Sequence, residues 1–253
     1  MRLLAALLAA VAASSAPAKP PARLFVTALD THPAITAETD VDLTLPSSAS
    51  AVDVDVPPGY RLDLRARAGT VIGTAGGSTL VAAAPGVWEA TGLSIAVTPT
   101  TDGGYRLDCS LARPARHLDL DIQHGLTNPP AGVVTWRAVA GPLEARSVVG
   151  FPQLLTVRAT LAAGTLRASG RLLVAGKPRA GVSVHIAVAS RDDFTDAREL
   201  GVARTRADGS YAFRSARRPA QSRLTLIAYV NFYVGAEGES IAPPPPVIAA
   251  VGS

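Results

Sequence analysis

The sequence predicts an all-β protein built from two β-sandwich domains that follow an export signal. Apolar and polar residues alternate with a period of two along most of the chain, as in strands that bury one face. Turn-forming Pro, Gly, Ser and Asp residues recur between these segments at roughly ten-residue spacing, which is the rhythm of a sandwich. The one segment that is compatible with a helix, residues 192–199, is equally compatible with an acidic loop.

Residues 1–18 have the organisation of a signal peptide. Arg2 is followed by an apolar run and then by Ser, Ala and Pro residues. We expect cleavage after Ala18, with Ala13 and Ser14 as alternative sites. An uncleaved anchor is the other interpretation, but the apolar run is shorter than the roughly 20 residues that cross a bilayer. Because no later segment is long and apolar enough to span, we expect a secreted or envelope-associated protein with no transmembrane segment after cleavage.

The single cysteine limits how the fold is held together. Cys109 alone cannot form an intramolecular disulfide, and no lipid-acceptor cysteine follows the signal peptide. Leu107 and Leu111 share its side of a strand, so we expect Cys109 to be buried, with a free thiol that pairs between molecules as the alternative. The hydrophobic fraction of 48% is enough for a fold that depends on its core alone.

Charge gives little indication of a partner. The formal net charge is +4, and loss of Arg2 with the signal peptide leaves 4 − 1 = +3. Basic and acidic residues are interleaved, whereas a nucleic-acid binder gathers basic residues on one stripe, so we predict no nucleic-acid partner. The exception is a basic cluster that we interpret as a solvated strand end and loop, with a patch for an anionic ligand as the alternative. This cluster consists of Arg214, Arg217, Arg218 and Arg223.

Residues 19–150 form the first predicted domain, which resembles no family that we recognise. Its strands are predicted over residues 40–44, 52–56, 61–65, 105–111, 117–124 and 133–139. Asp102-Gly103-Gly104 predicts a tight hairpin immediately before the strand at 105–111.

Residues 151–237 form the second predicted domain, and the joint is expected near residues 141–153, where Gly and Pro recur. Its strands are predicted over residues 155–161, 166–174, 182–189, 201–206, 210–214 and 224–234. This strand count and spacing are typical of immunoglobulin-like or prealbumin-like sandwiches. Residues 238–253 are predicted to be a proline-rich tail that lies extended.

The second domain contains a recognisable phrase. Gly170-Arg171-Leu172 leads through Gly176-Lys177-Pro178 to Ala180-Gly181-Val182, and Asp208-Gly209-Ser210-Tyr211 follows. Residues 154–236 therefore resemble the carboxypeptidase regulatory-like (transthyretin-like, Cna B-type) sandwich family. The resemblance implies a non-catalytic accessory module for rigidity, spacing or adhesion. It also implies a hairpin of the Asp-Gly type whose exit strand buries Tyr211 and Phe213.

One strand carries a group of potential metal ligands. His117, Asp119, Asp121 and Gln123 lie two residues apart, so a single strand places them on one face, where they could hold a divalent ion. The alternative is a polar face turned to water, and we favour it.

A second group of oxygen ligands lies in the segment that contains Asp192, Asp193, Asp196 and Glu199. Its carboxylates suit calcium, but their order differs from that of a calcium-binding hand, so we favour a solvated loop. We predict no metal and no other cofactor.

The two tryptophans are candidate binding residues, and the sequence contains no recognisable catalytic motif. Trp88 and Trp136 would be sugar-stacking platforms if they were exposed, but a lone tryptophan within a strand more often belongs to a core. No nucleophile motif or zinc-type spacing occurs, so we predict no catalytic residues and no enzymatic activity.

We predict a role in structure, adhesion or recognition at or outside a bacterial cell envelope. The expected partner is an envelope or extracellular polymer or protein. A carbohydrate- or peptide-binding accessory module, calcium-dependent or not, is the alternative. An envelope hydrolase is the least supported.

Overall fold

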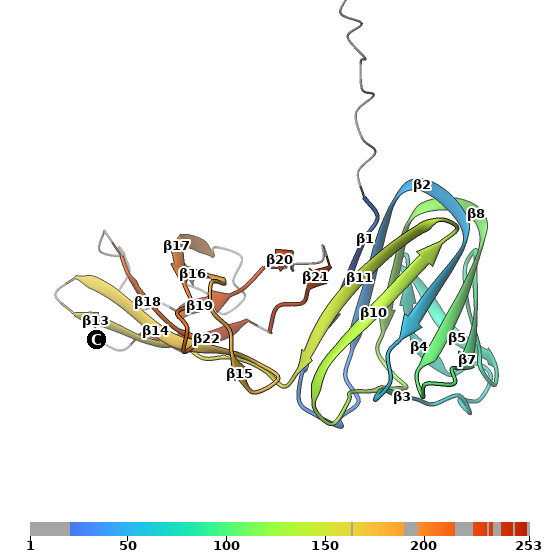
Figure 1. Ribbon diagram of the computed structural model, residues 1–253, viewed down its shortest axis with the longest axis horizontal. Helices are drawn as coiled ribbons and strands as arrows, with labels where there is room; N and C mark the ends of the chain where they lie inside the picture. Colours follow the sequence, from blue (N-terminus) through green and yellow to red (C-terminus); the bar gives the residue numbers. More distant parts are fainter. Residues whose placement is uncertain are drawn as a thin grey trace, which may run out of the picture.

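The computed structural model describes residues 21–162, 164–189, 197–215, 225–231, 233–234, 239–244 and 246–251. It confirms the all-β prediction, because every regular element in this part of the chain is a strand. None of the described residues forms a helix that could cross a membrane. The predicted signal peptide lies outside the described residues. Figure 1 shows the strands in two groups that lie side by side, β1–β11 and β12–β19 with β22.

The first group is one large sheet with a small accessory ladder. Its strands are β1 (Arg23–Ala28), β2 (Thr39–Val56), β3 (Arg61–Leu62), β4 (Val71–Ala75), β5 (Ser78–Ala84), β6 (Val87–Ala90), β7 (Leu93–Pro99), β8 (Tyr105–Ile122), β9 (Leu126–Thr127), β10 (Gly132–Ala140) and β11 (Leu143–Phe151). Strands β3 and β9 pair with each other outside the large sheet. The predicted hairpin at Asp102-Gly103-Gly104 is confirmed, because Pro99 of β7 pairs with Tyr105 of β8.

Two long strands fold this sheet into layers. β2 and β8 have 18 residues each and pair antiparallel at both of their ends, with register shifts around Ala49. Two separate strands are predicted from the sequence in each of these segments, and that prediction is wrong. Pro46 and Pro114 lie at the corner where the ladder is already interrupted, so their missing N–H groups do not break the strands.

A second difference concerns the strand predicted at residues 61–65. It ends after Leu62, because the Asp63 side chain accepts a hydrogen bond from Arg65 N at 3.0 Å and turns the chain.

Strand β8 also covers the edges of β4 and β7. One end of β8 pairs with β7 and the other with β4, and β4 to β7 pair in succession, so these strands close a ring. Trp88, Trp136, Cys109 and the other buried apolar side chains of the first group form one cluster. Burial of Cys109 and of both tryptophans was predicted correctly, and burial raises the pKa of the Cys109 thiol to about 12.

The second group is a sandwich of two sheets. Its strands are β12 (Gln153–Leu155), β13 (Arg158–Ala162), β14 (Thr165–Val174), β15 (Lys177–Pro178), β16 (Ser183–Ala189), β17 (Arg198–Arg204), β18 (Ser210–Arg214), β19 (Thr225–Tyr229) and β22 (Val247–Ala250), whereas β20 (Tyr233–Val234) and β21 (Ser240–Ile241) extend the large sheet of the first group. One sheet contains β12, β13, β14, β15 and β18, and the other has the order β17-β16-β19-β22. Their inner faces form a second apolar cluster around Leu166, Ile186, Tyr211 and Leu226. The division into two domains stays a prediction, and the two separate clusters are consistent with it.

The Asp208-Gly209 turn differs from the predicted hairpin. The turn closes as expected, with Arg206 N donating to Ser210 O at 2.8 Å. However, β17 pairs with β16 and β18 pairs with β14, so the turn joins the two sheets of the sandwich. Tyr211 is buried as predicted, because its hydroxyl donates to Thr156 O at 2.7 Å under the sheet edge, whereas Phe213 is only partly buried.

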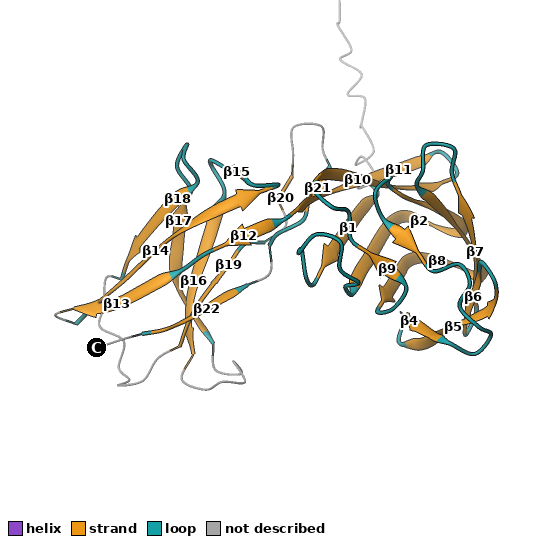
Figure 2. Cartoon of the chain, turned by 90° about the horizontal axis from the view of Figure 1, so that it is seen from below, coloured by secondary structure: helices purple, strands orange, loops and turns teal. Residues whose placement is uncertain are grey.

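The segment predicted as a proline-rich tail contains strands of both groups. β21 pairs parallel with β11 of the first group, while β22 pairs with β19 of the second. Figure 2 shows β20 and β21 between the two groups. Gln153, at the expected joint, adds to this link: its O accepts from Thr31 Oγ1 at 2.9 Å and its Nε2 donates to Ala242 O at 3.2 Å. Residues distant in sequence therefore hold the groups together.

Candidate functional site

A groove of about 470 Å³ lies where the two groups of strands meet. One wall is the end of β1 and the residue after it, and the other is the outer face of β19 with the segment that leads into β22. The lining residues are Thr27, Ala28, Leu29, Ile227, Tyr229, Val230, Pro243, Pro244, Pro246 and Ile248. Leu29 is 50% exposed and Ile248 is 56% exposed, so the groove presents large aliphatic side chains to solvent.

The strand pattern explains why apolar side chains face outward here. Leu226, Ala228 and Val230 of the β19 segment point into the second cluster, so Ile227 and Tyr229 must face the other way. The pairing of Ile227 with Ile248 places two isoleucines next to each other on the groove side.

A polar network borders the groove at Tyr229. Its hydroxyl donates to Glu199 Oε2 at 3.0 Å, and its ring stacks on His185 with a centroid distance of 5.0 Å. His185 Nδ1 lies 3.0 Å from the same carboxylate oxygen, and its Nε2 lies 3.3 Å from the Asn231 amide nitrogen. The hydrogen bonds from His185 and then Tyr229 lower the pKa of Glu199, while burial and then Glu199 raise the pKa of Tyr229.

This arrangement orients side chains rather than activating one. The Asn231 amide nitrogen donates to Nε2 of His185, so the ring proton is on Nδ1 and is donated to Glu199. Nε2 then faces an amide N–H, which is not acidic enough to give up its proton, so this contact supplies no proton for transfer.

The predicted metal ligands of β8 lie on one face, but the structure gathers a different set of carboxylates. Asp119 pairs with Asp42 and Asp121 with Asp40 across the β2–β8 ladder. Oxygens of Glu38, Asp40 and Asp121 all lie within 4.8 Å of one another. His117 Nδ1 is instead 3.6 Å from Asp42 Oδ1, which is too long for a hydrogen bond.

Like charges make this acidic face electrostatically unfavourable. Burial, followed by repulsion from Asp121, Glu38 and Asp119, raises the pKa of Asp40 to about 6. Because the folded-state pKa lies above the unfolded value of about 4, this group favours the fold below pH 4, and the benefit is lost as the pH rises through about 6. Calcium takes six to eight oxygen ligands, and three carboxylates on a half-exposed strand face do not by themselves make such a site.

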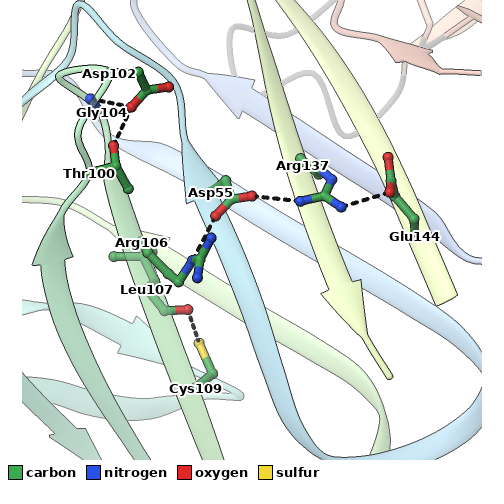
Figure 3. A network of polar contacts seen from close by, with 9 residues as sticks. All are labelled: Asp55, Thr100, Asp102, Gly104, Arg106, Leu107, Cys109, Arg137 and Glu144. Carbon is green, nitrogen blue, oxygen red and sulfur yellow. Dashed lines mark hydrogen bonds and ion pairs between the residues drawn. The ribbon is translucent and has the colours of Figure 1, made fainter. Parts of the chain in front are cut away.

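A second row of charges crosses the outer face of β8, β2, β10 and β11 (Figure 3). Asp55 accepts from Arg106 Nε at 3.1 Å and from Arg137 Nη1 at 3.2 Å, and Glu144 accepts from Arg137 Nη2 at 2.9 Å and Arg146 Nε at 2.8 Å. The two guanidinium groups lower the pKa of Glu144 to about 2. Each carboxylate bridges two arginines, so we interpret this row as surface charge that supports strand register.

The other predicted site residues that the structure describes do not line the groove. Asp192, Asp193 and Asp196 lie outside the described residues, whereas Glu199 belongs to β17 and joins the His185 network. Trp88 and Trp136 are 1% and 0% exposed, so neither can stack on a sugar at the surface. Sequence reasoning missed the groove residues, which come from segments about 200 residues apart; the run of prolines at 243–246 and the outward isoleucines were the available signal.

No family model and no curated protein sequence matches the chain. Among solved structures, a bacterial hydrophobin, BslA, is 18% identical with a TM-score of 0.34, covering 51% of this chain and 96% of that one. The D0-D1 domain of intimin is 10% identical with a TM-score of 0.24 and covers 90% of this chain and 98% of that one. Escherichia coli alpha-2-macroglobulin is 8% identical with a TM-score of 0.28 and covers 91% and 23%. These similarities are too distant to assign a function.

Proposed function

We propose that the chain is an exported, non-enzymatic recognition protein that binds an apolar extended segment of a partner protein in the groove between its two groups of strands. The signal peptide expected at residues 1–18 supports export to the envelope or beyond it. The groove itself carries the proposal, because it gathers exposed apolar side chains into one open concave surface.

The chemistry of the walls favours side chains of a protein over a sugar. A carbohydrate needs several hydrogen-bonding groups, but the Tyr229 hydroxyl already donates to Glu199, and prolines 243, 244 and 246 have no N–H to offer. Aliphatic and aromatic side chains would instead cover Leu29 and Ile248 and remove them from water.

The position of β22 favours an extended conformation for the bound segment. Within the described residues β22 pairs only with β19, so its other edge carries unpaired backbone groups beside Ile248. A partner strand can add to such an edge by backbone hydrogen bonds while its alternate side chains enter the adjoining groove.

Binding of a neutral apolar dye, N-phenyl-1-naphthylamine, tests the proposal. We expect the fluorescence of the dye to rise when the native protein is added. The affinity for the dye should be about tenfold lower in the double variant Leu29→Ser/Ile248→Ser, because two apolar side chains are removed from the site. A capped peptide of alternating leucine and lysine should displace the dye, and a soluble cello-oligosaccharide should not.

The matched control is Val71→Ser/Val133→Ser, which removes apolar side chains that are 45% and 57% exposed elsewhere on the surface. This variant should bind the dye as the parent does. Equal loss in both double variants, or displacement by the oligosaccharide alone, would contradict the proposal.

A further inference from the structure

Three arginines form a compact positive surface on the second group of strands, on the sheet opposite the one that borders the groove. Arg158 is in β13, Arg167 in β14 and Arg214 in β18, and all three side chains are exposed on the outer face. Arg167 and Arg214 are direct partners across the antiparallel ladder, so their Cα atoms lie about 5 Å apart. Like charges in this arrangement destabilise a sheet.

The first group of strands shows how such a pair is compensated within the protein. Arg137 and Arg146 are also direct cross-strand partners, and Glu144 lies between them and accepts from both. No carboxylate lies within ion-pair distance of Arg158, Arg167 or Arg214 in the described part of the chain. The ion pair of this face, Arg171 with Asp208 at 4.0 Å, belongs to a different row.

The surroundings of the pair are suited to an oxyanion. The three arginines border a hollow of about 510 Å³ that Thr160 and Ser169 also line. Thr160 is the partner of Arg167 on its other side, and Ser169 is the partner of Arg158, so each hydroxyl lies in a row with a guanidinium. Hydroxyl and guanidinium groups are both donors, and a guanidinium presents a rigid fork to oxyanions.

We propose that this surface binds the phosphate groups of an anionic polymer. One phosphate lies between Arg167 and Arg214 and accepts from both. Glu144 has the same position between Arg137 and Arg146. A phosphate group has enough acceptor oxygens to serve two guanidinium groups and a hydroxyl at once, whereas the two oxygens of a carboxylate such as Glu144 are both taken by its two guanidinium partners. Arg158 lies one row along the sheet, at a spacing of about 7 Å, and would contact the next charged group of the polymer.

Binding of inorganic polyphosphate to the full chain tests the proposal. Arg167→Gln/Arg214→Gln should weaken binding by about tenfold or more, since each guanidinium supplies charge-assisted hydrogen bonds. The slope of log affinity against log salt should become shallower by about two charges. Arg113→Gln/Arg116→Gln, which removes two exposed charges at the corner of β8, is the matched control and should bind as the parent does.

A third variant separates loss of binding from loss of fold. Arg167→Glu places a carboxylate opposite Arg214, so it should abolish polyphosphate binding while the midpoint of thermal unfolding stays the same or rises. Equal weakening in the corner control, polyglutamate binding as tight as polyphosphate binding, or retained binding in Arg167→Glu would each overturn the proposal. Dye binding in the groove should be unchanged in all three variants, which keeps this test independent of the proposed function.

Discussion

Replacing Trp136 by alanine should lower the free energy of unfolding by about 3–5 kcal/mol. The side chain is fully buried in the first cluster, its Nε1 donates to Tyr60 Oη at 3.2 Å, and its ring packs edge-on against Tyr60 with a centroid distance of 5.2 Å. Tyr60 makes a second edge-on contact, with Phe151 at 5.8 Å. Removing Trp136 therefore opens a cavity and loosens the aromatic group beside the joint between the two groups of strands.

Urea unfolding measures this effect, with the remaining Trp88 fluorescence as the signal. Trp136→Phe is the control, because it retains most of the apolar volume and loses the hydrogen bond to Tyr60, so its cost should be smaller. A Trp136→Ala midpoint equal to that of the parent would show that this side chain is not part of the core.

Replacing Gly170 by alanine should destabilise the second group of strands by about 3 kcal/mol, as overpacking does where backbone must move. A Cβ at this position would lie 1.8 Å from Thr156 O and 2.7 Å from Tyr211 Oη. These are the two atoms of the hydrogen bond that fixes Tyr211 beneath the sheet edge. The strand β14 cannot accept a methyl group there without separating Thr156 from Tyr211.

Far-UV circular dichroism during urea unfolding is the measurement for this variant, since both tryptophans belong to the first group. The neighbouring substitution Ser169→Ala changes an exposed side chain and should shift stability by less than about 0.5 kcal/mol. If Gly170→Ala unfolds at the parent's midpoint, the close approach of Thr156 to β14 is wrong.

The sequence predicted the strands because burial leaves a direct trace in alternation. Val41 and Leu43 are buried and Asp42 is not, as their pattern indicated, and the same holds for Leu118, Asp119 and Leu120. Alternation could not show that β2 continues past Pro46. Whether a proline ends a strand depends on whether its N–H would have been paired, and that is decided by the neighbouring strand.

The candidate sites were less predictable because they depend on pairing between distant segments. Glu38 and Asp40 join Asp121 only through the β2–β8 register. The groove similarly depends on β21 returning to β11, which places Pro243 and Pro246 opposite Leu29. No local pattern encodes these contacts. The sequence shows that Arg214 belongs to a basic cluster, but it does not show that Arg167 is its partner across the sheet.

We propose that this chain works outside the cytoplasm as a recognition protein. The most direct test is to fractionate producing cells into culture fluid, wall, membrane and cytoplasm, and to determine the intact mass and N-terminus of the protein in each fraction. We expect a chain that begins at Lys19 in the culture fluid or wall. A chain that retains Met1 in the cytoplasm or the membrane would contradict it.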